Sequence, residues 1–140
     1  MKIESPSEID LYPLLKVFNE ARSSAKGLTD QAVSLNDFQV MVDGEKILVA
    51  KLNDEIVGFA SVWEQDNFVH HLFVAPSYQN QGIGAALLKR CQNTFGLPLT
   101  LKCVEKNRRA CEFYENNGWD PIEKAIDSEG PYFLYRLKNV

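Results

Sequence analysis

The chain has 140 residues, of which 45% are hydrophobic and 24% are charged. This length and composition suit one domain, residues 1–140, with its own hydrophobic core. The formal net charge of −4 argues against non-specific binding to nucleic acid, which needs a basic surface. The sequence has no apolar run that could cross a membrane and no apolar segment of a signal peptide near its start, so neither a membrane partner nor secretion is expected.

Three cysteines lie in the second half of the chain: Cys91, Cys103 and Cys111. Their number is odd and none belongs to a C-x-x-C pair. They are therefore expected to be buried, reduced thiols of a cytoplasmic protein. The alternative, a catalytic cysteine, has no supporting motif around any of them.

The first predicted elements are a short strand over Met1–Glu4 and an amphipathic helix. Asp10 is expected to cap the N-terminus of this helix, and Pro13 is tolerated in a first helical turn. The helix is predicted to run to about Arg22. Its apolar residues recur at helical spacing, namely Leu11, Leu14, Leu15, Phe18 and Ala21.

A polar loop, a second helix and three strands follow. Residues Ser23–Leu28 are small and polar, as in loops that shape the mouth of a substrate site, and Leu35–Val42 is predicted to be helical. Two turns of hairpin chemistry, Asn53–Glu55 and Gln65–Asn67, predict that the strands around them form an antiparallel meander. The three predicted strands are Lys46–Leu52, Ile56–Glu64 and Phe68–Val74.

A glycine-containing run, Gln79-Asn80-Gln81-Gly82-Ile83-Gly84, separates the third strand from a helical pattern over Ile83–Phe95. Two glycines two apart let a backbone approach an anion closely, and the following helix N-terminus adds partial positive charge, so this run predicts a phosphate site. A dinucleotide fingerprint would need a third glycine where Leu87 stands, and no P-loop Gly-Lys-Ser/Thr follows Gly82. The remaining alternative is a turn that merely starts a helix.

The last elements alternate between strand and helix. The helix at Ile83–Phe95 should end at Gly96 and Pro98, and Gly118 should take the left-handed position after the final helix. The remaining predicted elements are a strand over Pro98–Val104, a helix over Asn107–Asn117, and strands over Trp119–Ala125 and Tyr132–Leu137. The complete predicted order is β-α-α-β-β-β-α-β-α-β-β.

A second motif lies on the final helix. Asn107-Arg108-Arg109-Ala110-Cys111-Glu112-Phe113-Tyr114-Glu115, followed by Asn117-Gly118-Trp119, places Asn107 and Tyr114 about two helical turns apart and so on one face. Together with Gln79, Gly82 and Gly84, this segment resembles GNAT-superfamily N-acetyltransferases, with Trp119 where the family pattern has Phe. The resemblance covers essentially the whole chain. It implies an α/β (α+β) GNAT acyl-CoA N-acyltransferase fold, a mixed sheet of about six to seven strands flanked by about four helices.

The same resemblance implies a site for acetyl-CoA. The glycine run would bind its pyrophosphate, the end of the third strand would pair with the pantetheine amides, Asn107 would contact the pantetheine arm, and Tyr114 would protonate the departing thiolate. An alternative for Tyr114 is a core aromatic residue whose hydroxyl happens to find a partner. The implied cofactor-binding residues are Leu72, Phe73, Val74, Gln79, Asn80, Gln81, Gly82, Ile83, Gly84, Ala85, Asn107 and Tyr114.

The acceptor amine must lose a proton, and histidine is the side chain whose charge changes nearest neutral pH. His70 and His71 are adjacent on a strand, so their side chains are expected on opposite faces, where they could not share a metal ion. Relatives with a basic residue on the strand face of Phe68 and His70 favour His70 as the base, with a structural histidine as the alternative. Many relatives carry Glu where Phe68 stands, which leaves Glu64 as the second candidate.

Two functions follow from these observations. The first is direct attack of a bound primary amine on acetyl-CoA in a ternary complex, since no nucleophilic residue is evident. The second is a non-catalytic acyl-CoA-binding or regulatory module on the same fold. The acceptor, a small molecule or a peptide, is not identified by the sequence; surface acids such as Asp66, Asp127 and Glu129 could attract a cation but are usually only solvated. No metal is expected, and the protein would be a monomer or a homodimer.

Overall fold

The computed structural model describes residues 1–24 and 31–138. Within them the predicted order of strands and helices is confirmed, with three short 3-10 turns added, at Glu8–Asp10, Glu64–Asp66 (η2) and Pro76–Tyr78 (η3). The elements are β1 (Lys2–Glu4), α1 (Leu11–Ser24), α2 (Leu35–Met41), β2 (Lys46–Leu52), β3 (Glu55–Trp63), β4 (Phe68–Val74), α3 (Ile83–Phe95), β5 (Leu99–Val104), α4 (Arg108–Asn116), β6 (Asp120–Asp127) and β7 (Gly130–Leu137). Of the predicted polar loop, Ser23 and Ser24 end α1, and residues 25–28 lie outside the described residues.

The start of α1 differs from the prediction. Asp10 does not cap the helix; it is the last residue of the 3-10 turn that leads into α1. Its buried carboxylate accepts a hydrogen bond from the Ser7 backbone N–H at 2.9 Å and forms an ion pair with Lys51 at 3.4 Å. The cap lies at the start of the 3-10 turn instead, where Ser7 and Asp10 form a capping box.

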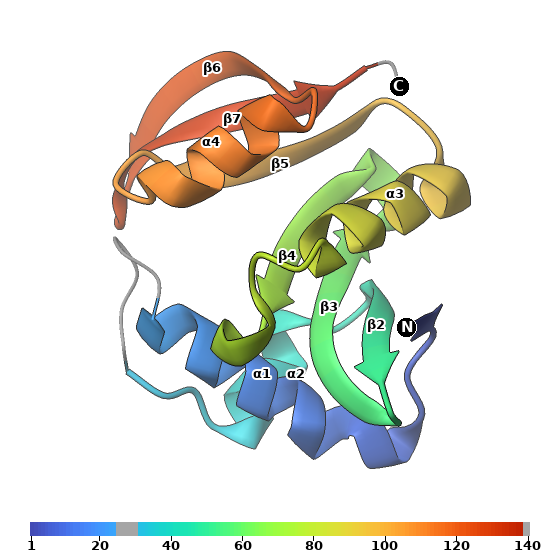
Figure 1. The fold of residues 1–140 in the computed structure, drawn as a ribbon. Coiled ribbons are helices and arrows are strands. Elements are labelled where there is room, and N and C mark those ends of the chain that lie inside the picture. Colours follow the sequence, from blue (N-terminus) through green and yellow to red (C-terminus); the bar gives the residue numbers. More distant parts are fainter. Residues whose placement is uncertain (25–30, 139–140) are drawn as a thin grey trace.

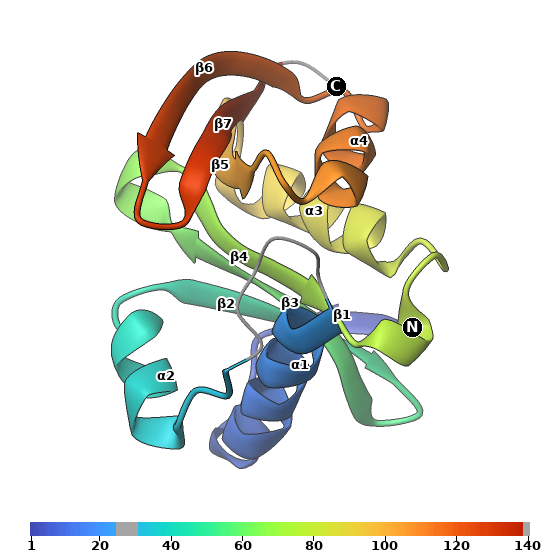
Figure 2. The same cartoon turned by 90° about the vertical axis from the view of Figure 1, so that its left-hand side faces the viewer.

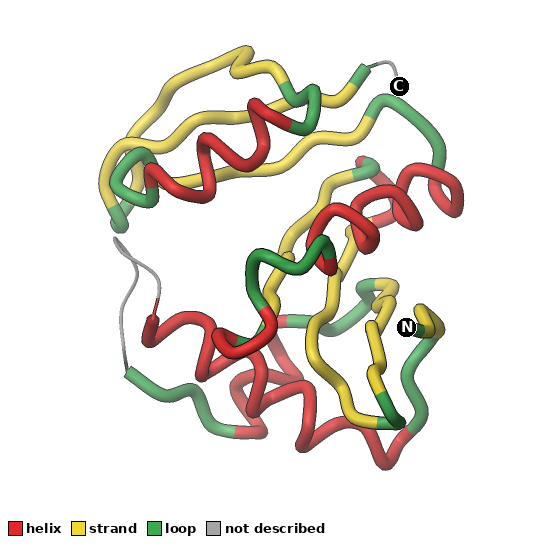
Figure 3. The backbone as a smooth tube through the Cα atoms, viewed as in Figure 1, coloured by secondary structure: helices red, strands yellow, loops and turns green. Residues whose placement is uncertain are grey.

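The strands of the described residues form one seven-stranded sheet in the order β1-β2-β3-β4-β5-β7-β6. The predicted meander of β2, β3 and β4 is confirmed, and Asn53, Asp54 and Asn67 adopt the left-handed backbone that tight turns require. The β4–β5 pair is parallel, whereas the other neighbouring pairs are antiparallel. The mixed sheet that the resemblance implied is thus present (Figure 1 and Figure 3).

Two hydrophobic clusters cover the two faces of the sheet. Residues from α1 and α2, including Phe18 and Phe38, pack with Phe59 of β3 on one face. On the other face, α3 and α4 contribute Leu87 and Cys111 to the larger cluster. Figure 2 shows α1 and α2 below the strands β2–β4, and α3 and α4 above them. No helix in the described residues is long and apolar enough to span a membrane.

The sheet opens between β4 and β5. Among the described residues, these strands pair through two positions, Phe68 with Thr100 and Val69 with Leu101. Beyond Val69, β4 continues beside β3, while β5 continues beside β7, so the two strands separate toward their C-terminal ends (Figure 1). The last residues of β4 therefore present one backbone edge that β5 does not cover.

Candidate active site

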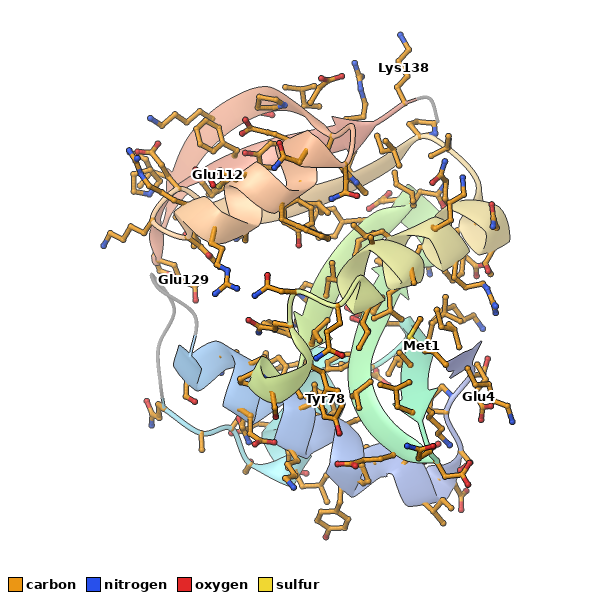
Figure 4. The ribbon with its side chains drawn as sticks, viewed as in Figure 1. Met1, Glu4, Tyr78, Glu112, Glu129 and Lys138 are labelled. Atoms are coloured by element: carbon orange, nitrogen blue, oxygen red, sulfur yellow. The ribbon has the colours of Figure 1, made fainter. Side chains whose placement is uncertain are left out.

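A cleft of about 1010 Å³ lies where β4 and β5 separate. It is lined by residues of α1, β4, the glycine run, β5, α4 and the β6–β7 turn. Three of its lining residues are labelled in Figure 4: Tyr78 on η3, Glu112 on α4 and Glu129 at the β6–β7 turn. The cleft thus spans the opening of the sheet and brings together residues that are far apart in the sequence.

Most of the residues that the sequence analysis assigned to a cofactor or to catalysis line this cleft; Gln81 does not. The residues that do are His70, Leu72, Phe73, Val74, Gln79, Asn80, Gly82, Ile83, Gly84, Ala85, Asn107 and Tyr114. The exposed Gln81 instead points its side-chain amide toward the Ser77 carbonyl, at 3.4 Å.

The glycine run has the geometry of an anion-binding loop. Gly82 is the N-cap of α3 with a left-handed backbone (φ 84°), and Asn80 is also left-handed (φ 65°). The Gln79 side chain folds back and donates a hydrogen bond to the Val74 carbonyl at 3.0 Å, which ties the loop to the end of β4. A Cβ added at Gly82 would meet no atom within 4 Å. The N-terminus of the 13-residue helix α3 therefore opens onto free space beside the cleft.

Gly84 has a structural role that the sequence did not indicate. A Cβ on Gly84 would lie 3.3 Å from Cζ of Phe113 and 3.8 Å from a methyl of Val74. The glycine therefore allows α3 to approach α4 and β4 closely, in addition to any approach of a phosphate.

Asn107 and Tyr114 lie at the two ends of α4 and both line the cleft. The side-chain oxygen Oδ1 of Asn107 caps the helix by accepting from the Ala110 N–H at 3.2 Å, as predicted. Tyr114 is 9% exposed and packs against Trp119 and Tyr135, with ring centroids 6.0 and 5.9 Å away. Burial raises the pKa of the Tyr114 phenol, so the group is fully protonated at neutral pH. Tyr114 is thus both a core aromatic residue and part of the cleft wall.

The expectation that His70 and His71 point to opposite faces is wrong. Ser61 pairs with His71 and Val62 pairs with Val69, so His70 is an extra residue in β4, a β-bulge. The bulge breaks the alternation of side chains, and the two imidazole rings stack with centroids 4.0 Å apart. The argument against metal binding that relied on opposed side chains therefore does not hold, because the ligand atoms of His70, His71 and Glu45 lie within 4.8 Å of one another.

Glu45, on the turn before β2, does not line the cleft but contacts two histidines that do, and sequence reasoning missed this contact. One carboxylate oxygen contacts His70 Nδ1, and the other is 3.7 Å from His71 Nδ1. Burial alone would raise the pKa of this carboxyl, but the polar side chains of His71, Ser61 and His70 around it outweigh that effect and lower the pKa to about 2. No motif surrounds Glu45, and its proximity to His70 depends on the bulge and the β2–β3–β4 register.

The other candidate base, Glu64, lies elsewhere. It begins η2, is exposed, and is not among the residues that line the cleft. Charged residues of both signs line the cleft, and Arg22 of α1 lies over the Phe18 ring at 5.0 Å. The charged lining residues are Arg22, Lys102, Lys106, Arg108, Arg109, Glu112 and Glu129. Of the surface acids named from the sequence, Asp127 pairs with Lys102 and Asp66 belongs to η2, so Glu129 is the one that faces the cleft.

The three cysteines are free and buried, as predicted. Burial raises the pKa of the Cys91 thiol to about 12 and also raises the pKa of Cys103. A thiol nucleophile reacts as its thiolate, so this burial disfavours the alternative of a catalytic cysteine.

Comparison with known proteins agrees with this architecture. The family model of the acetyltransferase (GNAT) domain matches residues 43–121, more than half of the chain. An uncharacterized N-acetyltransferase of Archaeoglobus fulgidus is 28% identical over 130 residues, covering 81% of each chain. A GCN5-related N-acetyltransferase from Rhodopseudomonas palustris has a TM-score of 0.84 at 18% identity, covering 99% of this chain and 95% of that one.

A structure of yncA from Salmonella typhimurium, solved with its cofactor acetyl-CoA, has a TM-score of 0.76 at 16% identity and covers 98% of this chain and 92% of that one. The TM-scores show that these neighbours share the fold of this chain, and the family model includes the meander, the glycine run and α4. The chain therefore belongs to the GNAT acetyltransferase family.

Proposed function

We propose that this acetyltransferase moves the acetyl group of acetyl-CoA to a primary amine by direct attack in a ternary complex. The observation that carries the proposal is the cleft between β4 and β5, which has an anion-binding helix N-terminus on one wall and a protonated phenol, Tyr114, on another. Buried, reduced thiols agree with action in the cytoplasm.

The cleft offers each part of acetyl-CoA a chemically suitable neighbour. The pyrophosphate would accept hydrogen bonds from the N–H groups of Gln81, Gly82 and Gly84, and the positive end of α3 would favour its charge. The pantetheine amides would pair with the uncovered edge of β4 at Leu72, Phe73 and Val74, as an added strand does. This places the thioester near the point where β4 and β5 part.

The reaction forms a C–N bond and breaks a C–S bond. His70 would accept a proton from the acceptor ammonium, since the nitrogen must present a lone pair to attack the thioester carbonyl. When the tetrahedral intermediate collapses, the CoA sulfur leaves with the electron pair of the C–S bond. Because its raised pKa makes complete proton transfer unfavourable at first, the Tyr114 phenol would hydrogen-bond the developing thiolate and give up its proton late. The nitrogen loses its second proton as the amide forms, and this proton would restore the Tyr114 phenol, while the proton on His70 passes to solvent.

Thiol release provides the test of this function. Purified protein would be mixed with acetyl-CoA and a panel of amines, each paired with a carboxylate-bearing analogue because Arg22 and Glu129 give the cleft both charges. We expect an amine-dependent release of thiol and an acetylated product of matching mass. Tight acetyl-CoA binding with no thiol release on any amine would instead favour the non-catalytic acyl-CoA-binding module.

The His70→Ala variant tests the base. In the wild type, kcat/KM should rise with pH through the range in which a histidine imidazole loses its proton, because the neutral ring is the base. His70→Ala should remove this rise and lower the value of kcat/KM at high pH by about 10²-fold. The measurement is kcat/KM against pH on the best acceptor of the panel.

Two further variants serve as controls for that profile. His71 is buried and hydrogen-bonded to Ser61 at 2.9 Å, so His71→Ala should lower the thermal stability and keep the pH-dependent rise. Glu64→Gln should leave the profile unchanged. A rise that survives in His70→Ala and vanishes in Glu64→Gln would transfer the role to Glu64.

A further inference from the structure

Four polar side chains from three segments meet at the bulge of β4. Glu45 comes from the turn before β2, Ser61 from β3, and His70 and His71 from β4 itself. Ser61 Oγ lies 2.9 Å from His71 Nδ1, and the Glu45 carboxylate contacts both imidazoles. The cluster sits beside the cleft, because both histidines line it.

The Glu45 carboxylate carries a buried charge. Its side chain is 5% exposed, and its pKa of about 2 keeps it ionised. Burying a charge raises the free energy of the folded state unless the charge has partners. The hydrogen bond from His70 Nδ1 offsets part of that cost. The other oxygen, Oε1, has no hydrogen-bond partner in the described structure, so the carboxylate has capacity for a further positive charge.

An ionised carboxylate can only accept hydrogen bonds, so the contact with His70 fixes the position of the imidazole proton. Nδ1 of His70 must be the donor, which leaves the lone pair on Nε2. The His70 side chain is 43% exposed, whereas the Glu45 side chain is buried. One side of the His70 ring therefore contacts the carboxylate, and the rest is open to solvent and the cleft. When Nε2 takes up a proton, the adjacent carboxylate stabilises the resulting imidazolium.

A metal ion is the competing explanation for two histidines and a carboxylate. The Nδ1 atoms of both rings already have partners, because His71 Nδ1 lies 2.9 Å from Ser61 Oγ and His70 Nδ1 contacts Glu45, so a metal ion at either atom would have to displace a hydrogen bond. Burial lowers the pKa of His71, Glu45 opposes this shift, and the charges of His70 and Arg22 add to it, so the net shift is downward and favours a neutral ring stacked on His70. Of the two rings, His70 is therefore the exposed one and the one in direct contact with the carboxylate.

We propose that Glu45 is a positioning residue for acetyl transfer: its carboxylate holds His70 through Nδ1, so that Nε2 faces the acceptor amine and accepts its proton. The inference rests on the proposed function, since it assigns a partner to the base of that reaction. The bulge at His70 is the feature of the fold that makes the pairing possible, because regular alternation would turn one of the two rings away from Glu45.

Nitrogen-15 NMR of the histidine side chains tests the pairing without any acceptor. In the wild-type protein at neutral pH, the neutral form of His70 should carry its proton on Nδ1. In Glu45→Gln, the amide can donate to Nδ1, so the proton should move to Nε2. Glu64→Gln, which changes an exposed glutamate outside the cleft, is the matched control and should leave the His70 signals unchanged.

Kinetics on the best acceptor give the second readout. Glu45→Gln should lower kcat by about 10²-fold and leave the KM for acetyl-CoA within about threefold, because the carboxylate acts through His70 and not on the cofactor. A wild-type His70 with its proton on Nε2, or an unchanged kcat in a folded Glu45→Gln variant, would overturn the proposal. So would activity that EDTA abolishes and Zn²⁺ restores.

The two readouts separate the inference from the function. If no amine is acetylated, the proposed function fails while the position of the His70 proton still reports on Glu45. If Glu45→Gln does not fold, the wild-type spectrum alone decides, since Nε2 protonation there contradicts the pairing.

Discussion

Replacing Tyr114 by Phe should lower kcat by about 10²- to 10³-fold while the Kd for acetyl-CoA stays within about threefold. In the proposed mechanism the hydroxyl stabilises the departing sulfur as negative charge develops on it, so its loss would remove an interaction of the transition state. Phenylalanine keeps the ring contacts with Trp119 and Tyr135, so the fold should be preserved. Steady-state kinetics and calorimetry on the same preparation measure both quantities.

Tyr135→Phe is the matched control for Tyr114→Phe. Its hydroxyl donates to Glu115 at 2.7 Å, and it is not among the residues that line the cleft. This variant should lose some thermal stability and keep its kcat. Full turnover in Tyr114→Phe would remove Tyr114 from the mechanism, and an equal loss of kcat in both variants would assign the effect to general packing.

The Gly84→Val variant should bind acetyl-CoA at least about 100-fold more weakly, which corresponds to roughly 2.7 kcal/mol. Its first side-chain carbon would already lie 3.3 Å from Phe113, and the two methyl groups of valine extend beyond it. The side chain would therefore push the start of α3 away from α4 and occupy space beside the N–H groups that we propose bind the phosphates. Calorimetric titration with acetyl-CoA measures the change.

A double variant separates packing from phosphate binding at this position. Phe113→Ala removes the ring that a residue at Gly84 would meet. If Gly84 served packing alone, Gly84→Val/Phe113→Ala would recover the acetyl-CoA affinity of Phe113→Ala. We expect it to remain at least about tenfold weaker than Phe113→Ala, and equal affinities would contradict a phosphate site at this glycine.

The order of elements could be predicted from local signals. Hydrophobic periodicity, the hairpin turns at Asn53 and Asn67, and the cap at Asn107 each depend on residues close in sequence, and the structure places these elements within a residue or two of the expected bounds. Asp10 is the exception. An aspartate in the last position of a 3-10 turn has the same neighbours in sequence as a helix N-cap, and only the backbone path distinguishes them.

The surroundings of the candidate base His70 could not be predicted in the same way. Alternation along a strand assigns His70 and His71 to opposite faces, and a single inserted residue in the β3–β4 register reverses that assignment. Glu45 is 25 residues from His70 in the sequence, so no spacing rule connects them. The packing of Gly84 against Phe113 is likewise a contact between two helices. Resemblance indicated the cleft residues on β4, the glycine run and α4, whereas the partners of those residues required the fold.

The most direct test of the acetyl-CoA site is a titration of the nitrogen-15-labelled protein with acetyl-CoA, followed by the backbone amide signals. We expect the largest shifts at Gln81, Gly82 and Gly84 and at Leu72–Val74, with the exposed edge strand β6 at Ile126 unaffected. Desulfo-CoA, which keeps the pyrophosphate and lacks the sulfur, should reproduce the shifts of the glycine run. Binding that leaves the amides of Gly82 and Gly84 unchanged, or shifts confined to residues outside the cleft, would contradict the central claim that acetyl-CoA binds where β4 and β5 separate.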